Sequence, residues 1–427
     1  MYDVIVIGGG AAGFYGAINL AEFRPDLKIA ILEQGKQVLG KVKVSGGGRC
    51  NVTHAQFNPK ILSQHYPRGE KELLGPFNTH HTEHTVEFFQ KRGIELKIED
   101  DGRMFPVSNS SQTIIDCFMD AIASSKIDLI RNTAVTDILI PTSDSANREV
   151  YEVQTKTTSF FAKRLLITTG SSSKMWNVLK RLGHTIIEPV PSLFTFNVHD
   201  PRIEGIPGIS THARVKVVSR DLPGKKITVS LKSSAERSEE LVSEGPLLIT
   251  HWGMSGPAIL KLSAWGARIL HDYQYRFRIQ VNWVPEYHQQ GLFSFLMEVK
   301  ELEARKTVFR THPLDIPKRL WGKLVQAAGI LPDQKWADIS KKQLQELARE
   351  LTAGEFLVEG KSTFKEEFVT AGGIDLKEVN FKTFGSKLHP GLYFAGEILN
   401  IDAITGGYNF QNAWTGSYLA AQAIANS

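Results

Sequence analysis

The feature that most constrains the fold is a glycine cluster close to the start of the chain. Residues 3–7, DVIVI, are a short apolar run rich in β-branched side chains, typical of a strand buried on both faces. Gly8, Gly10 and Gly13 follow with the spacing G-x-G-x-x-G, and we expect the next residues, AAGFYGAINLAEF, to form a helix. Such glycines permit a tight turn, close approach of a pyrophosphate and packing of the helix on the strand. The pattern predicts a dinucleotide site at the helix N-terminus.

A second predicted strand, KIAILE, ends in an acid that suits this site. Glu33 lies 20 residues after Gly13, where a carboxylate accepts hydrogen bonds from a ribose hydroxyl. The same carboxylate repels a 2′-phosphate. Strand, glycines, helix, strand and acid in this order indicate NAD or FAD, and the motif alone does not separate the two.

The far end of the chain favours the flavin. Residues 389–425, HPGLYFAGEILNIDAITGGYNFQNAWTGSYLAAQAIA, predict a strand over 392–395, glycine turns and a long helix beginning near residues 408–411. This segment resembles the closing flavin segment of two-dinucleotide-binding-domain flavoproteins, which implies that Glu397 binds the ribityl chain. A helix N-terminus at the flavin stabilises negative charge on its reduced form. The alternative is a terminal strand–helix pair of the same sheet.

A second glycine cluster, SGGGRCN, occupies residues 45–51. Glycines exclude side chains, so we expect the backbone of residues 45–48 to lie against the cofactor. Arg49 is then placed to offset phosphate charge, and Asn51 to hydrogen-bond the cofactor. Cys50 has no partner cysteine nearby in the sequence, so we interpret it as a small packed residue. The alternative for the whole segment is a flexible loop.

Four motifs together resemble one family. GKVKVSGGGRCNVTH, EDDGRMFPVSNSSQTIIDCF, THWGMSGPAIL and the C-terminal segment, in this order, are similar to the HI0933-like (YhiN-like) flavoproteins. The resemblance implies bound FAD, an FAD domain built from both chain ends, and a domain inserted between them. Family members are linked to amine oxidation, to reduction of bile-acid intermediates and to dihydrouridine formation in ribosomal RNA. One departure is a shortened loop with Ser171–Ser173 where relatives carry glycines.

These patterns and the resemblance predict one FAD site, while the catalytic residues stay unknown. The expected cofactor-binding residues are Gly8, Gly10, Ala11, Ala12, Gly13, Glu33, Gln34, Lys41, Ser45, Gly46, Gly47, Arg49, Cys50, Asn51, Val135, Thr169, Gly170, Gly396, Glu397, Asp402, Gly406, Gly407, Tyr408 and Asn409. His251 is a weak candidate for an acid/base group, against a packed histidine. Arg103 is a weak candidate for holding substrate or flavin, against a surface ion pair.

The expected fold class is α/β, with a discontinuous Rossmann-like FAD-binding domain, an inserted mainly-β domain and a small helical subdomain. We expect the FAD domain over residues 1–190 and 359–427, antiparallel strands over 191–285 and helices over 286–358. An antiparallel meander is expected over 149–170. His80, His84 and Glu87 have helical spacing, and we expect an exposed histidine-rich helix there instead of a metal site.

Composition bounds the partners and the compartment. The chain has 427 residues, a net charge of +5, and two cysteines without a close pair. The small basic excess permits an anionic substrate or RNA without requiring either. No apolar run approaches the roughly 20 residues of a membrane helix, and the start of the chain lacks a signal-peptide pattern. We expect a cytoplasmic FAD-dependent oxidoreductase acting on a small molecule, with NAD(P)H as a transient reductant, no metal and no membrane. The alternatives are reduction of uridine in ribosomal RNA and amine oxidation.

Overall fold

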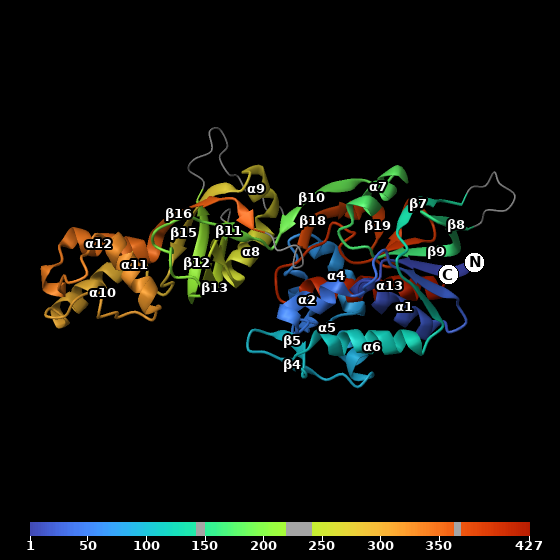
Figure 1. Ribbon diagram of the computed structural model, residues 1–427, viewed down its shortest axis with the longest axis horizontal. Helices are drawn as coiled ribbons and strands as arrows, with labels where there is room; N and C mark the ends of the chain where they lie inside the picture. The colour runs from blue at the N-terminus through green and yellow to red at the C-terminus, as the bar shows by residue number, and fades with distance from the viewer. Residues whose placement is uncertain (142–149, 219–240, 363–368) are drawn as a thin grey trace. The chain divides into compact units, whose positions relative to one another are not determined.

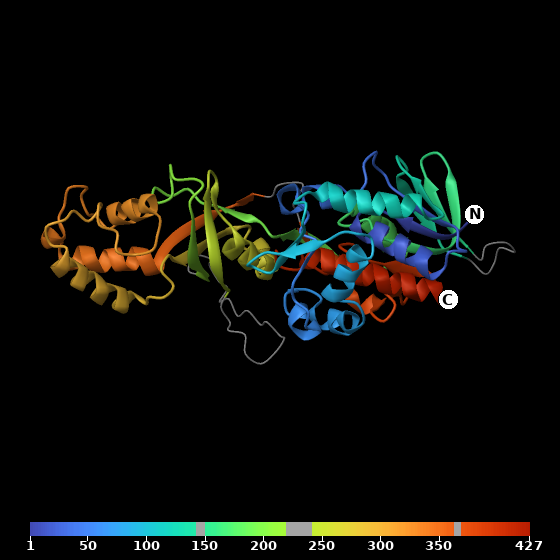
Figure 2. The same cartoon turned by 90° about the horizontal axis from the view of Figure 1, so that it is seen from below.

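The computed structural model describes residues 1–141, 150–218, 241–362 and 369–427. The chain forms two compact units: residues 1–190 with 365–427, and residues 191–364. Both ends of the chain therefore lie in the first unit (Figure 1, Figure 2). We expected the chain to re-enter the FAD domain at residue 359, whereas it re-enters the first unit at residue 365. The reason is that β16 (Gly354–Glu359) and β17 (Lys361–Ser362) pair with strands of the second unit.

In its described residues, the first unit is built on a nine-stranded sheet with a parallel centre. β1 (Tyr2–Ile7) lies between β2 (Ile29–Leu32) and β9 (Ser159–Ile167), and it pairs in parallel with both. Val4 to Ile7 are all buried, as the apolar run predicted. The other strands are β6 (Ile127–Ile130), β7 (Val135–Leu139), β8 (Tyr151–Thr155), β19 (Val379–Asn380), β20 (Gly385–Ser386) and β21 (Leu392–Phe394). β7, β8 and β9 form the antiparallel meander, which starts earlier than expected.

Helices surround this sheet, and the first and last of them pack against each other. α1 (Ala11–Phe23) contacts α13 (Tyr408–Ala425), so the two chain ends share one core. The remaining helices of the unit are α2 (Gly40–Gly48), α3 (Pro59–Ser63), α4 (Glu70–Thr79), α5 (Thr82–Gln90), α6 (Ser111–Ala123), α7 (Ser173–Arg181) and the 3-10 helix over Leu376–Glu378. Two small sheets complete it: β3 (Thr53–His54), β4 (Leu96–Ile98) and β5 (Arg103–Pro106), and β10 (Ile186–Ser192) with β18 (Val369–Ile374).

The described part of the second unit is an antiparallel seven-stranded sheet with helices packed on it. Besides β16 and β17, its strands are β11 (Thr195–Asn197), β12 (Ser210–Val218), β13 (Val242–Thr250), β14 (Gly253–Ser255) and β15 (Arg276–Asn282). β12 and β15 alternate between buried apolar and outward-facing residues, which is the pattern of a sheet with one covered face.

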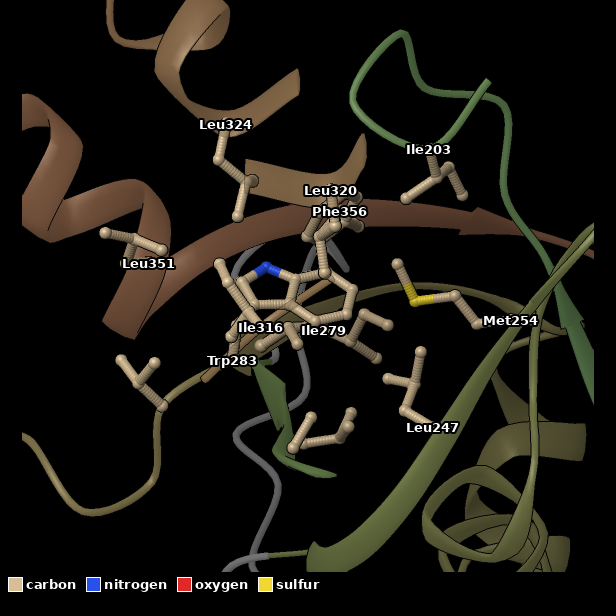
Figure 3. Packing of buried hydrophobic residues seen from close by; sticks show 14 of the residues in the cluster. Ile203, Leu247, Met254, Ile279, Trp283, Ile316, Leu320, Leu324, Leu351 and Phe356 are labelled. Atoms are coloured by element: carbon tan, nitrogen blue, oxygen red, sulfur yellow. The ribbon is translucent and has the colours of Figure 1, made fainter. Parts of the chain in front are cut away.

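Helices and strands of this unit share one core around Trp283, as Figure 3 shows. The helices are α8 (Pro257–Trp265), α9 (Ala267–Asp272), α10 (Gln289–Leu302), α11 (Lys318–Ala327), α12 (Lys341–Ala353) and the 3-10 helix over Trp336–Asp338. Leu320 and Leu324 of α11, Leu351 of α12 and Phe356 of β16 lie around the indole ring (Figure 3). Within the four described ranges, no helix has the length and apolarity needed to cross a membrane.

Candidate functional site

The turn between β1 and α1 is shaped by backbone that leaves no room for side chains. Gly8 has a φ of +114°, and a Cβ on it would lie 2.6 Å from the Thr168 carbonyl oxygen. A Cβ on Gly13 would overlap the carbonyl oxygen of Gly8. Gly10 differs, because no described atom lies within 4 Å of the position its Cβ would take. The turn is therefore packed against the protein at Gly8 and Gly13 and open at Gly10.

α1 begins at this opening. Gly10 is its N-cap, and no described side chain caps the helix. The first N–H groups of a helix have no partner within it and carry partial positive charge, which suits a phosphate. Ala11 and Ala12, the first two helical residues, leave these groups accessible because their side chains are small.

Glu33 is fixed beside the same turn. Its carboxylate accepts a hydrogen bond from the Gly9 N–H at 2.8 Å and one from the Gly35 N–H at 2.7 Å. Gln34 lies between Glu33 and Gly35 in the chain. Each carboxylate oxygen keeps a second acceptor site, so Glu33 is held by the backbone and still able to accept from a ribose hydroxyl.

The second glycine cluster interrupts α2. Ser45 has extended backbone angles (φ −60°, ψ 145°), and Gly46, Gly47 and Gly48 then have φ of +59°, +68° and +83°. A Cβ on Gly46 would press on the Phe105 ring, whereas Gly47 and Gly48 have no described atom within 4 Å of theirs. At Gly47 and Gly48 the backbone therefore faces open space without side chains, so a cofactor could lie directly against it.

Arg49 is engaged by the protein on two sides. Its Nη1 donates to Glu99 Oε1 at 2.6 Å, and its guanidinium lies 4.0 Å from the centre of the Phe105 ring. Arg103 shares the same acid and also donates to Asp101 at 2.7 Å. Both arginines therefore belong to one ion-pair network at β5. Their roles toward the cofactor or a substrate stay predictions.

Cys50 is buried in left-handed backbone, with a φ of +61°. Its N–H donates to the Ser45 carbonyl at 3.0 Å, which closes the glycine segment. Burial raises the pKa of its thiol to about 12, so the sulfur stays protonated at neutral pH. These features are those of a small packed residue.

Asn51 connects the glycine segment to the C-terminal helix. With its amide oriented to satisfy its neighbours, the oxygen accepts from the Gly407 N–H at 3.0 Å and the nitrogen donates to the Thr53 carbonyl at 3.0 Å. Gly407 is the N-cap of α13, with a φ of +93°. The Asn51 side chain therefore hydrogen-bonds the residue that begins α13, and this contact places the helix N-terminus beside the glycine segment.

The turn before α13 is held from two sides. His54 Nδ1 lies 3.0 Å from the Gly406 carbonyl oxygen, and its ring stacks on Tyr408 with a centroid separation of 4.5 Å. Asn409 makes two hydrogen bonds with the backbone of Ala403, at 3.0 and 3.2 Å. These contacts order the turn without using the first N–H groups of α13.

Glu397 follows β21 and lies beside Gly170. It forms an ion pair with Lys41, and its other oxygen accepts from the Thr370 N–H at 3.3 Å. A Cβ on Gly170 would lie 3.7 Å from Glu397. Gly396, before Glu397, has a φ of +77°. The structure therefore brings together predicted residues that lie far apart in the sequence.

Two of the predicted residues carry buried polar groups here, and one of them has a partner, Arg68, that the sequence analysis did not identify. The Thr169 hydroxyl is buried and has no hydrogen-bond partner within the described structure. Asp402 is fully buried, and its Oδ1 and Oδ2 accept hydrogen bonds from Arg68 Nε and Nη2. The sequence offered no signal for Arg68, because its partner lies 334 residues away.

These observations test whether a flavin dinucleotide fits. Open backbone at Gly10 and Gly47, the available N–H groups of α1 and α13, and the unpartnered Thr169 hydroxyl all belong to one unit. An orphaned buried hydroxyl is rare unless a ligand or water completes it. The residues present fit a flavin dinucleotide such as FAD.

Other predicted residues are not brought into this group by any described contact. Val135 begins β7 and pairs with β8, and His251 is exposed in the turn between β13 and β14 of the second unit. The expected exposed histidine helix is wrong for His80. That residue follows α4, is 3% exposed and stacks on Tyr418, and burial lowers its pKa to about 3.

Comparison with known proteins adds relatives over almost the whole chain. The sequence profile of the HI0933-like protein Rossmann domain matches residues 2–423. A ribosomal RNA dihydrouridine synthase of Escherichia coli (strain K12) is 25% identical, covering 99% of this chain and 97% of the relative. A 3-dehydro-bile acid delta(4,6)-reductase of Clostridium scindens is also 25% identical, covering 100% of this chain and 99% of the relative.

A solved structure has the same architecture. It is a 3-ketosteroid-delta4-(5alpha)-dehydrogenase from Rhodococcus jostii RHA1 in complex with 4-androstene-3,17-dione. It matches with a TM-score of 0.50 and 11% identity, over 100% of this chain and 97% of that one. At this identity the likeness concerns the fold alone.

Proposed function

The chain belongs to the HI0933-like family of FAD-dependent oxidoreductases, and from that premise we propose that it reduces a carbon–carbon double bond conjugated to a carbonyl. The preferred substrate is a uridine in ribosomal RNA. NAD(P)H is the proposed electron donor, and the cytoplasm the proposed compartment.

The chemistry shared by the relatives carries this proposal. The names of the two end-to-end relatives describe a uridine reduced to dihydrouridine and a delta(4,6) bond reduced in a 3-dehydro-bile acid. In uracil the reducible bond is conjugated to a ring carbonyl, and in a 3-oxo steroid the 4,6 bonds are conjugated to the 3-oxo group. Both reactions require a hydride at the far carbon of the conjugated system and a proton at a carbon nearer the carbonyl.

The chain's own residues have separate tasks in such a reaction. The first N–H groups of α1, opened by Gly10, hold the pyrophosphate. The N-terminus of α13 would stabilise negative charge on the reduced cofactor. FAD, when bound, would supply the two-electron redox chemistry.

A proton donor is also needed. His251 stays our candidate, because it is exposed on a tight turn whose Gly253 has no room for a Cβ against the Phe196 carbonyl oxygen. An imidazole is a common general acid in enzymes.

The decisive experiment joins donor and acceptor in one assay. Purified protein is mixed anaerobically with NADH or NADPH, and flavin absorbance is followed. Deproteinised ribosomal RNA from a strain lacking the gene is then added, and dihydrouridine is measured by mass spectrometry. We expect flavin bleaching by one nucleotide, reoxidation by RNA, and dihydrouridine in the product. Bleaching without RNA-dependent reoxidation would remove RNA as the substrate.

A 3-oxo steroid with 4,6 double bonds is the second candidate substrate, favoured by the bile-acid reductase relative. The same reduced protein, mixed with such a steroid, would be reoxidised at a saturable rate. Amine oxidation makes the opposite prediction, since amines would bleach the oxidised flavin without any nucleotide.

A further inference from the structure

We infer that a basic segment of the second unit, residues 304–323, binds the sugar–phosphate backbone of RNA. The segment joins α10 to α11 and continues through the first turns of α11. The inference deepens the proposed function and rests on it, because it assigns a surface of this chain to the proposed RNA substrate.

Positive charge is concentrated in this segment, although the overall composition of the chain is nearly balanced. The segment ARKTVFRTHPLDIPKRLWGK contains six lysines and arginines and a single acid, Asp315. Its net charge of +5 equals that of the entire chain, so the remaining 407 residues are neutral on balance. Half to two-thirds of protein–nucleic acid hydrogen bonds go to phosphate and sugar, and arginine and lysine make many of them.

The cations are exposed and available. Arg305, Arg310 and Lys318 are exposed. Across the described ranges, no carboxylate lies within ion-pair distance of these three. Two others are engaged: Lys306 pairs with Glu303 at 2.6 Å, and Arg319 donates to the Gly205 carbonyl at 2.5 Å.

The backbone that carries them is ordered by the core. Val308 is fully buried, its N–H donates to the Gln334 carbonyl at 3.1 Å, and its own carbonyl accepts from Trp321 Nε1 at 3.0 Å. Ile316 and Leu320 lie in the cluster around Trp283, as Figure 3 shows. Apolar residues therefore anchor the segment while its charged residues face outward. Fixed cations lose less conformational entropy on binding than those on a flexible tail.

Helix stability does not account for this arrangement. Lys318 and Arg319 occupy the first turn of α11, which has no acid, and the N-cap Pro317 offers no capping side chain. Cations at a helix N-terminus oppose its dipole and so destabilise the helix. Residues that destabilise their own helix without a compensating local contact are expected at functional positions.

The sheet of the same unit provides the contrast. Arg214 on β12 lies opposite Glu244 on β13, and Arg276 forms an ion pair with Glu359 at 3.4 Å. These two arginines each lie beside an acid. In the basic segment, by contrast, six cations accompany a single acid, Asp315, as binding to a polyanion requires.

The test removes three of the available cations from the holoenzyme. The variant is Arg305→Ala/Arg310→Ala/Lys318→Ala. Its matched control is Lys71→Ala/Lys91→Ala/Lys156→Ala, which removes three exposed lysines of the first unit. Binding of a fluorescein-labelled single-stranded oligouridylate is measured between 0.05 and 0.3 M salt, about the range where counterion release dominates. Flavin content and Tm serve as checks of folding.

We expect the basic-segment variant to bind the oligouridylate about 100-fold more weakly near 0.1 M salt. The slope of log affinity against log salt should become shallower by about 2, because each lost phosphate contact contributes about 0.7. The control should match the wild type. Equal affinities and slopes for variant, control and wild type would overturn the inference. So would absent RNA binding by the wild type, or binding only to vesicles containing phosphatidylserine.

Dihydrouridine formation separates this inference from the proposed function. If the wild type modifies ribosomal RNA and the variant does so with unchanged KM, the surface is wrong and the function stands. If the wild type binds RNA through the segment but forms no dihydrouridine, the surface stands and the function fails.

Discussion

The two glycine clusters of the first unit look alike in sequence and differ in what requires them. At Gly8 and Gly13, neighbouring backbone occupies the space a side chain would need. At Gly47 and Gly48, within the described structure, that space is empty and the positive φ is the constraint. Gly8 and Gly13 are therefore required by packing within the protein, whereas Gly47 and Gly48 are required by their backbone conformation and leave the space beside them free for a ligand.

Gly13→Ala should have the largest effect, because it tests the packed cluster. The new methyl group would overlap the Gly8 carbonyl oxygen, and backbone cannot rotate away as a side chain can. Overpacking typically costs 1–3 kcal/mol, and we expect about 3 kcal/mol or more here. Urea unfolding of the apo-protein measures it. Gly40→Ala, with no described atom within 4 Å, is the control; equal midpoints for the two variants would refute the packing argument.

Gly10→Ala should separate folding from binding. Its methyl group meets no described protein atom but enters the space assigned to the pyrophosphate. We expect the free energy of unfolding to change by less than about 1 kcal/mol, and FAD affinity to fall about tenfold or more, which is 1.4 kcal/mol. The flavin-to-protein absorbance ratio after dialysis reports this. Gly75→Ala in α4, which also has open space, should keep full occupancy; retained flavin in Gly10→Ala would move the pyrophosphate elsewhere.

Local signals predicted the first cluster well. The helix expected after the glycines is α1, Ala11–Phe23, and the C-terminal helix begins at Tyr408, within the expected range. Apolar periodicity and glycine spacing act over a few residues, so they can be read from the sequence. Glu33 was identified by its distance along the chain, and the structure holds it beside Gly9.

Partners distant in the sequence could not be predicted. Arg49 pairs with Glu99, Asn51 accepts from Gly407, and His80 is buried against Tyr418. Each of these contacts is created by tertiary packing, and nothing near either residue marks it. The same limit applies to β17, which we expected in the FAD domain and which lies in the second unit. Its partner β11 lies more than 160 residues earlier in the chain.

Gly47→Ala and Gly47→Asn sharpen the account of the second cluster. Alanine at a φ of +68° should cost about 1–2 kcal/mol, because a Cβ in left-handed backbone crowds the following carbonyl. Asparagine tolerates this backbone better, so it should cost less in stability. Both side chains fill the open space, and both should lower flavin occupancy. If Gly47→Asn kept wild-type flavin, the backbone conformation alone would explain the glycine.

Cys50 gives the smallest effect and the most specific one. Burial raises the pKa of its thiol from 9.0 to about 12, so above pH 9 the unfolded chain loses a proton that the folded chain keeps. Stability contributed by this group is full below pH 9 and declines as pH rises toward 12. Between pH 8 and pH 10 the wild type should lose about 1 kcal/mol more than Cys50→Ala. Urea unfolding at pH 8, 9 and 10 measures the difference, in which buried tyrosines common to both proteins cancel. Parallel losses in the two proteins would mean that the thiol ionises freely, and the glycine segment around it would then be open to solvent instead of packed.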